Sequence, residues 1–93
     1  MPLQFEWDPD KAASNLGKHQ VSFLEAATVF SDSLSLTFYD PDHSANEERY
    51  ITMGLSGSGK FLIVAHTDRD GTIRIISARG MTRRERMFYE EQN

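Results

Sequence analysis

The stretch Phe61-Leu-Ile-Val-Ala-His-Thr-Asp-Arg-Asp-Gly-Thr-Ile-Arg-Ile-Ile-Ser-Ala-Arg79 decides the fold, because it predicts a β-hairpin in the middle of a sheet. Residues 61–65 are apolar on both faces, which is typical of a central strand. Asp70-Gly71 is a favoured dipeptide for a tight hairpin turn. Residues 72–79 form the returning strand, which we expect to end at Gly80.

The flanking sequence predicts further strands and three helices. Alternating residues at 3–7, 34–38 and 49–55 indicate strands with one buried face. Asp8-Pro9 begins a helix that is expected to reach His19. Ser22-Phe-Leu-Glu25 and Thr82-Arg-Arg-Glu85 are capping boxes, which open a helix over 23–30 and a C-terminal helix.

This order is β-α-α-β-β-β-β-α and predicts the α+β class. We expect an antiparallel β-meander packed by an N-terminal helical hairpin and a C-terminal helix. With 93 residues and no visible linker, residues 1–93 are expected to form a single domain.

Composition narrows the chemistry. The chain has no cysteine, so disulfides, a thiol nucleophile and cysteine-ligated metals are excluded. The first residues lack the pattern of a signal peptide, and no apolar run is long enough to span a bilayer. We therefore expect a soluble, cytoplasmic protein with no membrane partner.

Positive charge is concentrated in one part of an acidic chain. Residues 60–87 contain seven Lys or Arg and three acids, whereas the whole chain has a net charge of −4. Such a block is typical of a surface for a polyanion, with nucleic acid the leading candidate. The alternative is a solvated face whose arginines pair with nearby glutamates.

Two loops resemble ligand sites only superficially. Asp40-Pro-Asp-His43 contains possible metal ligands, but aspartates in such loops usually form local turn bonds. Ser56-Gly-Ser-Gly-Lys60 lacks the phosphate-binding loop pattern and joins two strands. No metal or other cofactor is therefore expected.

Arg74, Arg79 and His66 are the candidates for phosphate chemistry. Arg74 and Arg79 are five residues apart, so strict alternation sends them to opposite faces unless a bulge intervenes. We expect Arg74 to share its side with Ile76 and Ala78, and to pair with an anion or with an internal carboxylate such as Glu6 or Glu48.

His66 is expected nearly opposite Arg74 across the hairpin, on the same face. A titratable group beside a fixed cation suits RNA cleavage without metal, although a histidine at a strand end is more often structural. Lys18, at the end of the first helix, is either a helix-terminal cation or an electrostatic contact for the substrate. Tyr89 is either a base-stacking residue or a packing residue.

Ordered motifs along almost the whole chain resemble BrnT-type toxins. They are Phe5-Glu-Trp-Asp-Pro, Asn15 with Lys18-His19, Val21-Ser-Phe23, Glu25-Ala, Glu48-Arg-Tyr, His66-Thr, Arg74-Ile-Ile-Ser-Ala-Arg79, Glu85-Arg and Tyr89-Glu90. Gln20 departs from the pattern, because many relatives carry Gly there to end the helix in a left-handed residue.

The resemblance implies a RelE-like ribonuclease toxin of a type II toxin–antitoxin pair, cleaving RNA without metal to inhibit translation. It also implies a hetero-oligomer with a BrnA-type antitoxin, through which alone the toxin contacts operator DNA. We expect His66, Arg74, Arg79 and Lys18 to be catalytic, and Arg83 and Tyr89 to bind RNA. The alternatives are a non-catalytic interaction subunit that acts as co-repressor, and direct DNA binding by the C-terminal helix, which lacks a helix-turn-helix companion.

Overall fold

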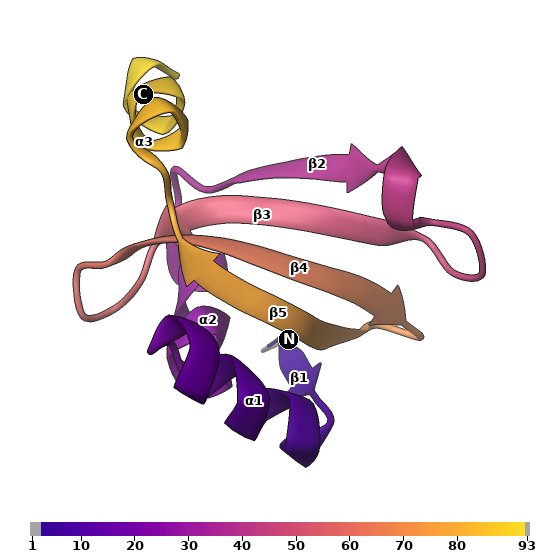
Figure 1. Ribbon diagram of the computed structural model, residues 1–93. Coiled ribbons are helices and arrows are strands. Elements are labelled where there is room, and N and C mark those ends of the chain that lie inside the picture. Colours follow the sequence, from indigo (N-terminus) through magenta and orange to yellow (C-terminus); the bar gives the residue numbers. More distant parts are fainter. Residues whose placement is uncertain (1–2, 93) are drawn as a thin grey trace.

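The computed structural model describes residues 3–92, which form a mixed five-stranded sheet carrying three helices (Figure 1). In chain order the elements are β1 (Gln4–Glu6), α1 (Pro9–His19), α2 (Phe23–Thr28), the 3-10 turn η1 (Val29–Ser31), β2 (Leu36–Asp40), the 3-10 turn η2 (Pro41–His43), β3 (Arg49–Leu55), β4 (Phe61–Arg69), β5 (Thr72–Gly80) and α3 (Arg83–Glu91). The predicted α+β class and the predicted order of helices and strands are confirmed.

The strands lie in the order β1-β5-β4-β3-β2. Strands β2 to β5 form the predicted antiparallel meander, and β1 adds a parallel edge strand beside β5. The predicted hairpin turn is confirmed: Asp70 and Gly71 have φ of 52° and 84°, the positive values that such a tight turn requires. Strand β4 continues to Arg69, beyond the apolar run that predicted it.

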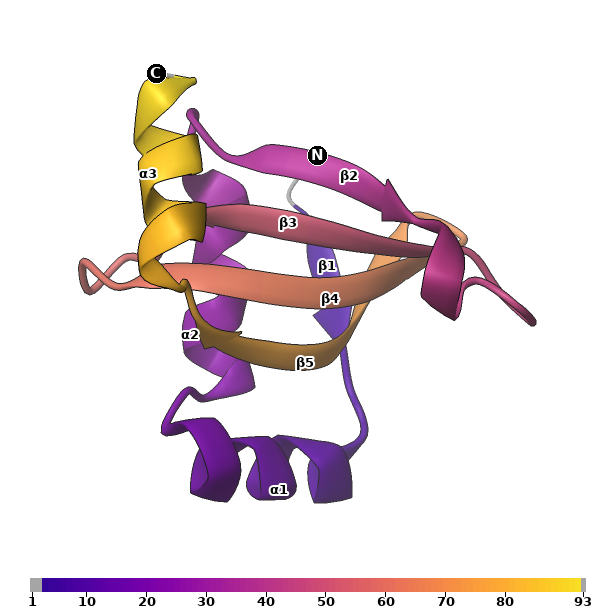
Figure 2. The same cartoon turned by 45° about the horizontal axis from the view of Figure 1, so that its top comes forward.

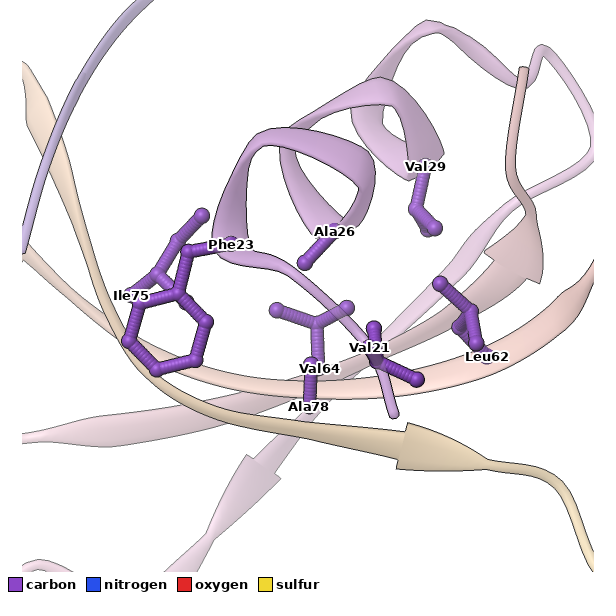
Figure 3. Close-up of a cluster of buried hydrophobic side chains, with 8 residues drawn as sticks. All are labelled: Val21, Phe23, Ala26, Val29, Leu62, Val64, Ile75 and Ala78. Atoms are coloured by element: carbon purple, nitrogen blue, oxygen red, sulfur yellow. The ribbon is translucent and has the colours of Figure 1, made fainter. Parts of the chain in front are cut away.

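Helices α1 and α2 cover one face of the sheet (Figure 2). The main core lies between them and β4 and β5, as Figure 3 shows, and contains Val21, Phe23, Ala26, Val29, Leu62, Val64, Ile75 and Ala78. Buried Asn15 ties α1 to this sheet: its amide donates to the carbonyls of Val21 and Ala78 at 3.0 and 2.9 Å, and its oxygen accepts from the Ala78 N–H at 3.0 Å.

Helix α3 packs against one end of the other face (Figure 1). Tyr89 is buried there with Met53 and Ile63, and its ring lies edge-on to Phe61. The predicted capping box at the start of α3 is present in both directions, between Thr82 and Glu85. The rest of this face carries no helix among the described residues.

Local hydrogen bonds move two of the element boundaries from their predicted places, whereas the first helix ends at His19 as predicted. The second helix tightens into η1 after Thr28. Strand β2 begins at Leu36 rather than Leu34, because Asp32 accepts bonds from the N–H groups of Leu34 and Ser35 and forms a turn. Gln20 ends α1 in the left-handed conformation, with φ of 57°, at a cost of about 1 kcal/mol relative to Gly.

No helix within residues 3–92 has the length and apolar character needed to cross a membrane.

Candidate active site

A β-bulge in the central hairpin determines which side chains share a face. Ala65 pairs with Ser77 but His66 pairs with Ile75, so Ile76 is an extra residue in β5. The bulge reverses the alternation between Arg74 and Arg79, and both therefore point to the same face. The expectation that Arg74 shares its side with Ala78 is wrong, because Ala78 belongs to the core under α1 and α2.

The face that α1 and α2 leave uncovered, called the open face below, carries a row of polar side chains across all five strands. Strand pairing aligns Asp40 on β2 with Arg49 on β3, Thr67 on β4, Arg74 on β5 and Glu6 on β1. Aligned residues on neighbouring strands project from the same face. This row places two arginines one strand apart, with Thr67 between them.

A shallow cavity of about 190 Å³ continues from this row toward α3. Its lining joins two arginines and a histidine to small and apolar residues of the sheet: Asp40, His43, Arg49, Ile51, Ile63, Ala65, Ser77 and Arg79. A larger hollow, of about 610 Å³, lies at the end of α1 and includes His19, Lys60 and Arg86. We place the candidate site in the smaller cavity, because its polar groups include a histidine hydrogen-bonded to a carboxylate.

Two of the arginines of the open face are held by carboxylates. Arg74 Nη1 donates to Glu6 Oε2 at 2.7 Å, so one of the internal partners expected from the sequence is confirmed. Arg79 donates from Nη1 and Nη2 to the two oxygens of Glu85 at 2.8 and 2.9 Å. This bidentate bond lowers the pKa of Glu85 to about 2 and raises the pKa of Arg79.

Arg49 differs from both, because its guanidinium has no hydrogen bond or ion pair within residues 3–92. Its charge nevertheless contributes to the local field: after Arg69, which binds Glu47 through two hydrogen bonds, Arg74 and Arg49 further lower the pKa of the Glu47 carboxyl. Within residues 3–92 the open face therefore has one arginine with a free guanidinium, Arg49, beside three that are held by carboxylates: Arg69, Arg74 and Arg79.

The expectation that His66 and Arg74 share a face is wrong. The bulge pairs His66 with Ile75 and turns it toward the helices, where it is 6% exposed and lies edge-on to the ring of Phe30. Its Nε2 bonds Thr52 Oγ1 at 2.7 Å, and Nδ1 has no partner within the described residues. Burial lowers the pKa of His66 to about 4, so it is neutral at pH 7.

The other residues expected at the site lie away from the cavity. Lys18 is exposed in the last turn of α1, whose helix packs against the opposite face. Arg83 is exposed on α3 and lines a separate hollow with Arg84, Met87 and Phe88. Tyr89 is a core residue, as the packing alternative predicted: burial and its bond to Asp32 raise its pKa to about 12.

Sequence reasoning missed Arg49 and His43 as site residues. Arg49 lies in a segment of mixed charge, outside the basic block of residues 60–87. In the sequence His43 is a candidate metal ligand only, and residues 3–92 contain no group of three or more His, Asp or Glu side chains placed to hold a metal ion. Strand register points to both residues. A strand that ends at Asp40 and a following antiparallel strand that begins at Arg49 bring these two residues together at one edge of the sheet.

This fold and this face define a class: a small α+β protein with an arginine-rich surface suited to an anionic ligand. Comparison with known proteins gives the family. Residues 7–85 match the family described as "Ribonuclease toxin, BrnT, of type II toxin-antitoxin system". The chain belongs to this family of ribonuclease toxins, and the resemblance seen in its motifs is confirmed.

A solved structure supports the fold. The Brucella abortus ribonuclease toxin BrnT, described at 1.1 Å resolution, superposes with a TM-score of 0.64 and is 19% identical. The alignment covers 88% of this chain and 100% of the Brucella chain. At this identity the likeness shows a shared fold. No curated protein matched the sequence.

Proposed function

We propose that this toxin cleaves RNA without a metal ion at the open face of its sheet, and thereby inhibits translation. The observation that carries the proposal is the bulge that brings Arg74 to the uncovered face on which Arg49 and Arg79 also lie. Cleavage by an RNA 2′-hydroxyl develops negative charge on the phosphate, and fixed cations aimed at that charge stabilise the transition state. Arginine suits this task because its planar donors match two phosphate oxygens.

Thr67 supports a phosphate position within the row. Its side chain lies between Arg49 and Arg74 in the register and is 1% exposed, and its hydroxyl has no hydrogen-bond partner within the described residues. A buried hydroxyl without a partner is unfavourable. The hydroxyl is itself buried, so a phosphate oxygen can pair with it only after the side chains that cover it move aside.

The proposal assigns different roles to the other residues that were expected at the site, which are Arg83, Lys18, His66 and Tyr89. Arg83, exposed on α3, extends the cationic surface for the RNA chain. Lys18 and His66 stay predictions, and the position of each away from the open face argues against direct contact with the reacting phosphate. Tyr89 acts by packing α3 onto the sheet rather than by stacking on a base.

The partner that we propose is a BrnA-type antitoxin, which neutralises the toxin in a hetero-oligomeric cytoplasmic complex and is its only link to operator DNA. A second function has one observation in its favour. Arg74 and Arg79 are already paired with Glu6 and Glu85, so the open face is partly neutralised before any RNA binds. On that reading the chain is a non-catalytic partner of the antitoxin and a co-repressor.

RNA cleavage in EDTA separates the two functions. We expect the purified chain to cleave single-stranded RNA at an unchanged rate in EDTA, and Arg49→Ala, Arg74→Ala and Arg79→Ala each to lose activity about 10²-fold or more. Lys11→Ala, which removes an exposed helical cation of α1 on the opposite face of the sheet, is the matched control and should retain activity. Loss of cleavage in EDTA would refute metal independence, and full activity in the three variants would refute the site.

Binding gives an independent measure of the same cations. Removing one cation that binds a phosphate should reduce the slope of log affinity against log salt by about 0.7 for single-stranded RNA. We expect this change in Arg49→Ala, measured with an RNA carrying 2′-deoxy at the cleaved position. A chain that neither binds nor cleaves RNA, yet binds the antitoxin, would support the co-repressor function instead.

A further inference from the structure

The open face carries a histidine that the proposed arginine site leaves without a role. His43 ends η2, the single turn between β2 and β3, and lines the cavity together with Arg49 and Arg79. The chain has three histidines. His66 is buried on the opposite face, and His19 lines the separate hollow at the end of α1, so His43 is the histidine that shares a cavity with Arg49 and Arg79.

Local hydrogen bonds hold His43 in a defined orientation. Its Nδ1 lies 2.8 Å from Asp40 Oδ2, and the Asp40 side chain is only 14% exposed whereas that of His43 is 65% exposed. Ser44 fixes the turn itself: its hydroxyl donates to the Asp40 carbonyl at 2.5 Å and accepts from the Arg49 N–H at 2.9 Å. The loop is thereby tied to the strand that carries the free arginine.

The carboxylate also determines which ring nitrogen is available. An ionised Asp40 accepts a hydrogen bond, so Nδ1 of a neutral His43 carries the proton and Nε2 is left as a base. A carboxylate that orients an imidazole is the arrangement used to activate a hydroxyl for attack, and here the carboxylate is mostly shielded from solvent while the imidazole is exposed. Arg49 and Arg79 lie in the same cavity, where they can hold the phosphate that such a hydroxyl attacks.

We propose that His43 is a catalytic residue of this toxin and that Asp40 is its positioning residue; this inference rests on the proposed ribonuclease function. Nε2 of His43 takes the proton of the RNA 2′-hydroxyl while the 2′-oxygen forms a bond to phosphorus. The bond from phosphorus to the 5′-oxygen breaks, and that oxygen takes a proton from water or from the imidazolium. The products are a 2′,3′-cyclic phosphate and a 5′-hydroxyl, without any change of oxidation state.

Asp40→Asn tests the positioning role of the carboxylate that contacts Nδ1 of His43. We expect this variant to lower the cleavage rate while its affinity for the RNA with 2′-deoxy at the cleaved position stays close to that of the wild type, because Asp40 orients the imidazole and does not itself bind the RNA.

The test compares the wild-type chain with His43→Ala, Asp40→Asn and the control His19→Ala on one short RNA in EDTA. We expect His43→Ala to lower the cleavage rate about 10²- to 10⁴-fold, with partial recovery on addition of free imidazole. Its affinity for an RNA with 2′-deoxy at the cleaved position should stay within about 3-fold of wild type, because His43 acts on the 2′-hydroxyl. His19→Ala should cleave as the wild type does.

Three outcomes would overturn the proposal in distinguishable ways. If the wild-type chain does not cleave RNA, the proposed function fails and this inference fails with it. If the wild-type chain cleaves and His43→Ala cleaves equally fast, only the assignment of His43 fails. If imidazole does not restore His43→Ala, or if products end in 3′-phosphate without a cyclic intermediate, His43 is not the proton acceptor. Circular dichroism of each variant checks that the fold is unchanged.

Discussion

Neutralising Glu85 tests how the open face is held together. Its carboxylate accepts two hydrogen bonds from Arg79, at 2.8 and 2.9 Å, and one from the Thr82 N–H at 2.8 Å. It therefore joins the end of β5 to the first turn of α3. Glu85→Gln keeps the shape and a helix-capping group while removing the charge, so we expect the free energy of unfolding to fall at neutral pH.

The magnitude follows from the pKa of Glu85, which its bonds lower from 4.5 to about 2. At about 1.4 kcal/mol per pKa unit, this difference corresponds to about 3.5 kcal/mol as an upper limit. The side chains of Arg79 and Glu85 are 42% and 30% exposed, and solvent-exposed ion pairs contribute about 0–1 kcal/mol. We therefore expect a loss of about 1–2 kcal/mol for Glu85→Gln at pH 7, since the pair is only partly exposed.

The pH dependence of the free energy of unfolding shows whether Glu85 acts through its charge. Because the folded pKa of Glu85 lies below its unfolded value, its stabilisation is present above about pH 4.5 and is lost as pH falls toward 2. Urea unfolding followed by Trp7 fluorescence should thus show a gap between wild type and Glu85→Gln that narrows from pH 7 to pH 3. Glu90→Gln, which breaks a more exposed 3.6 Å pair with Arg86 on the same helix, should change stability by less than about 0.5 kcal/mol.

Two results would refute this reasoning. A gap of the same size at pH 7 and pH 3 would mean that Glu85 acts through packing or capping rather than through its charge. A loss in Glu90→Gln as large as that in Glu85→Gln would mean that the bidentate geometry adds nothing to an ordinary surface pair.

Four further changes test the fold. Gly54→Ala should destabilise the chain by about 1–3 kcal/mol in urea unfolding, since a Cβ there lies 2.9 Å from a side-chain carbon of η1. Gly17→Ala adds a Cβ in open space on a helix and should stabilise the chain by about 0.5–1 kcal/mol. Asn15→Ala should cost about 2–4 kcal/mol because it leaves buried backbone groups unpaired, and an Asn15→Ala protein as stable as wild type would contradict that. Gln20→Gly should raise the melting temperature, because glycine adopts the left-handed conformation of this position without the cost of about 1 kcal/mol that Gln20 bears. An unchanged melting temperature would mean that Gln20 is not strained. NMR titration should find His66 with a pKa near 4. Because this folded pKa lies below the unfolded value, the stabilisation from neutral His66 is present above pH 6.5 and is lost as pH falls toward 4. A titration midpoint near 6.5 would contradict the burial of His66.

Local signals predicted most of the fold because their physics is local. A capping box such as Thr82 with Glu85 satisfies backbone donors within one turn, and Asp70-Gly71 adopts positive φ whatever surrounds it. The same reasoning failed at Leu34, where Asp32 draws the backbone into a turn before the strand begins. That competition depends on a neighbouring side chain, which an alternation pattern does not register.

The candidate site was harder to predict because one bulge governs it. Without Ile76 as an extra residue, strict alternation places Arg74 on the face of His66 and away from Arg79, which is what the sequence suggested. With the bulge, Arg74 joins Arg79 and His66 turns into the core. Nothing in Arg74-Ile-Ile-Ser-Ala-Arg79 marks the position of a bulge, since Ile76 is as suitable for a regular strand as its neighbours.

Two carboxylates bear on how an acidic chain could present the proposed phosphate site. Glu6 and Glu85 come from β1 and α3, at the two ends of the described chain, and each holds one arginine of the open face in place. Ordering the long side chains of Arg74 and Arg79 costs rotamer entropy, and this cost is part of the folding free energy rather than of RNA binding. A phosphate that displaces a carboxylate meets a guanidinium that is already oriented, whereas Arg49 accepts it without competition. If the proposed site is correct, the carboxylates weaken indiscriminate anion binding and at the same time preorganise Arg74 and Arg79 for RNA phosphates.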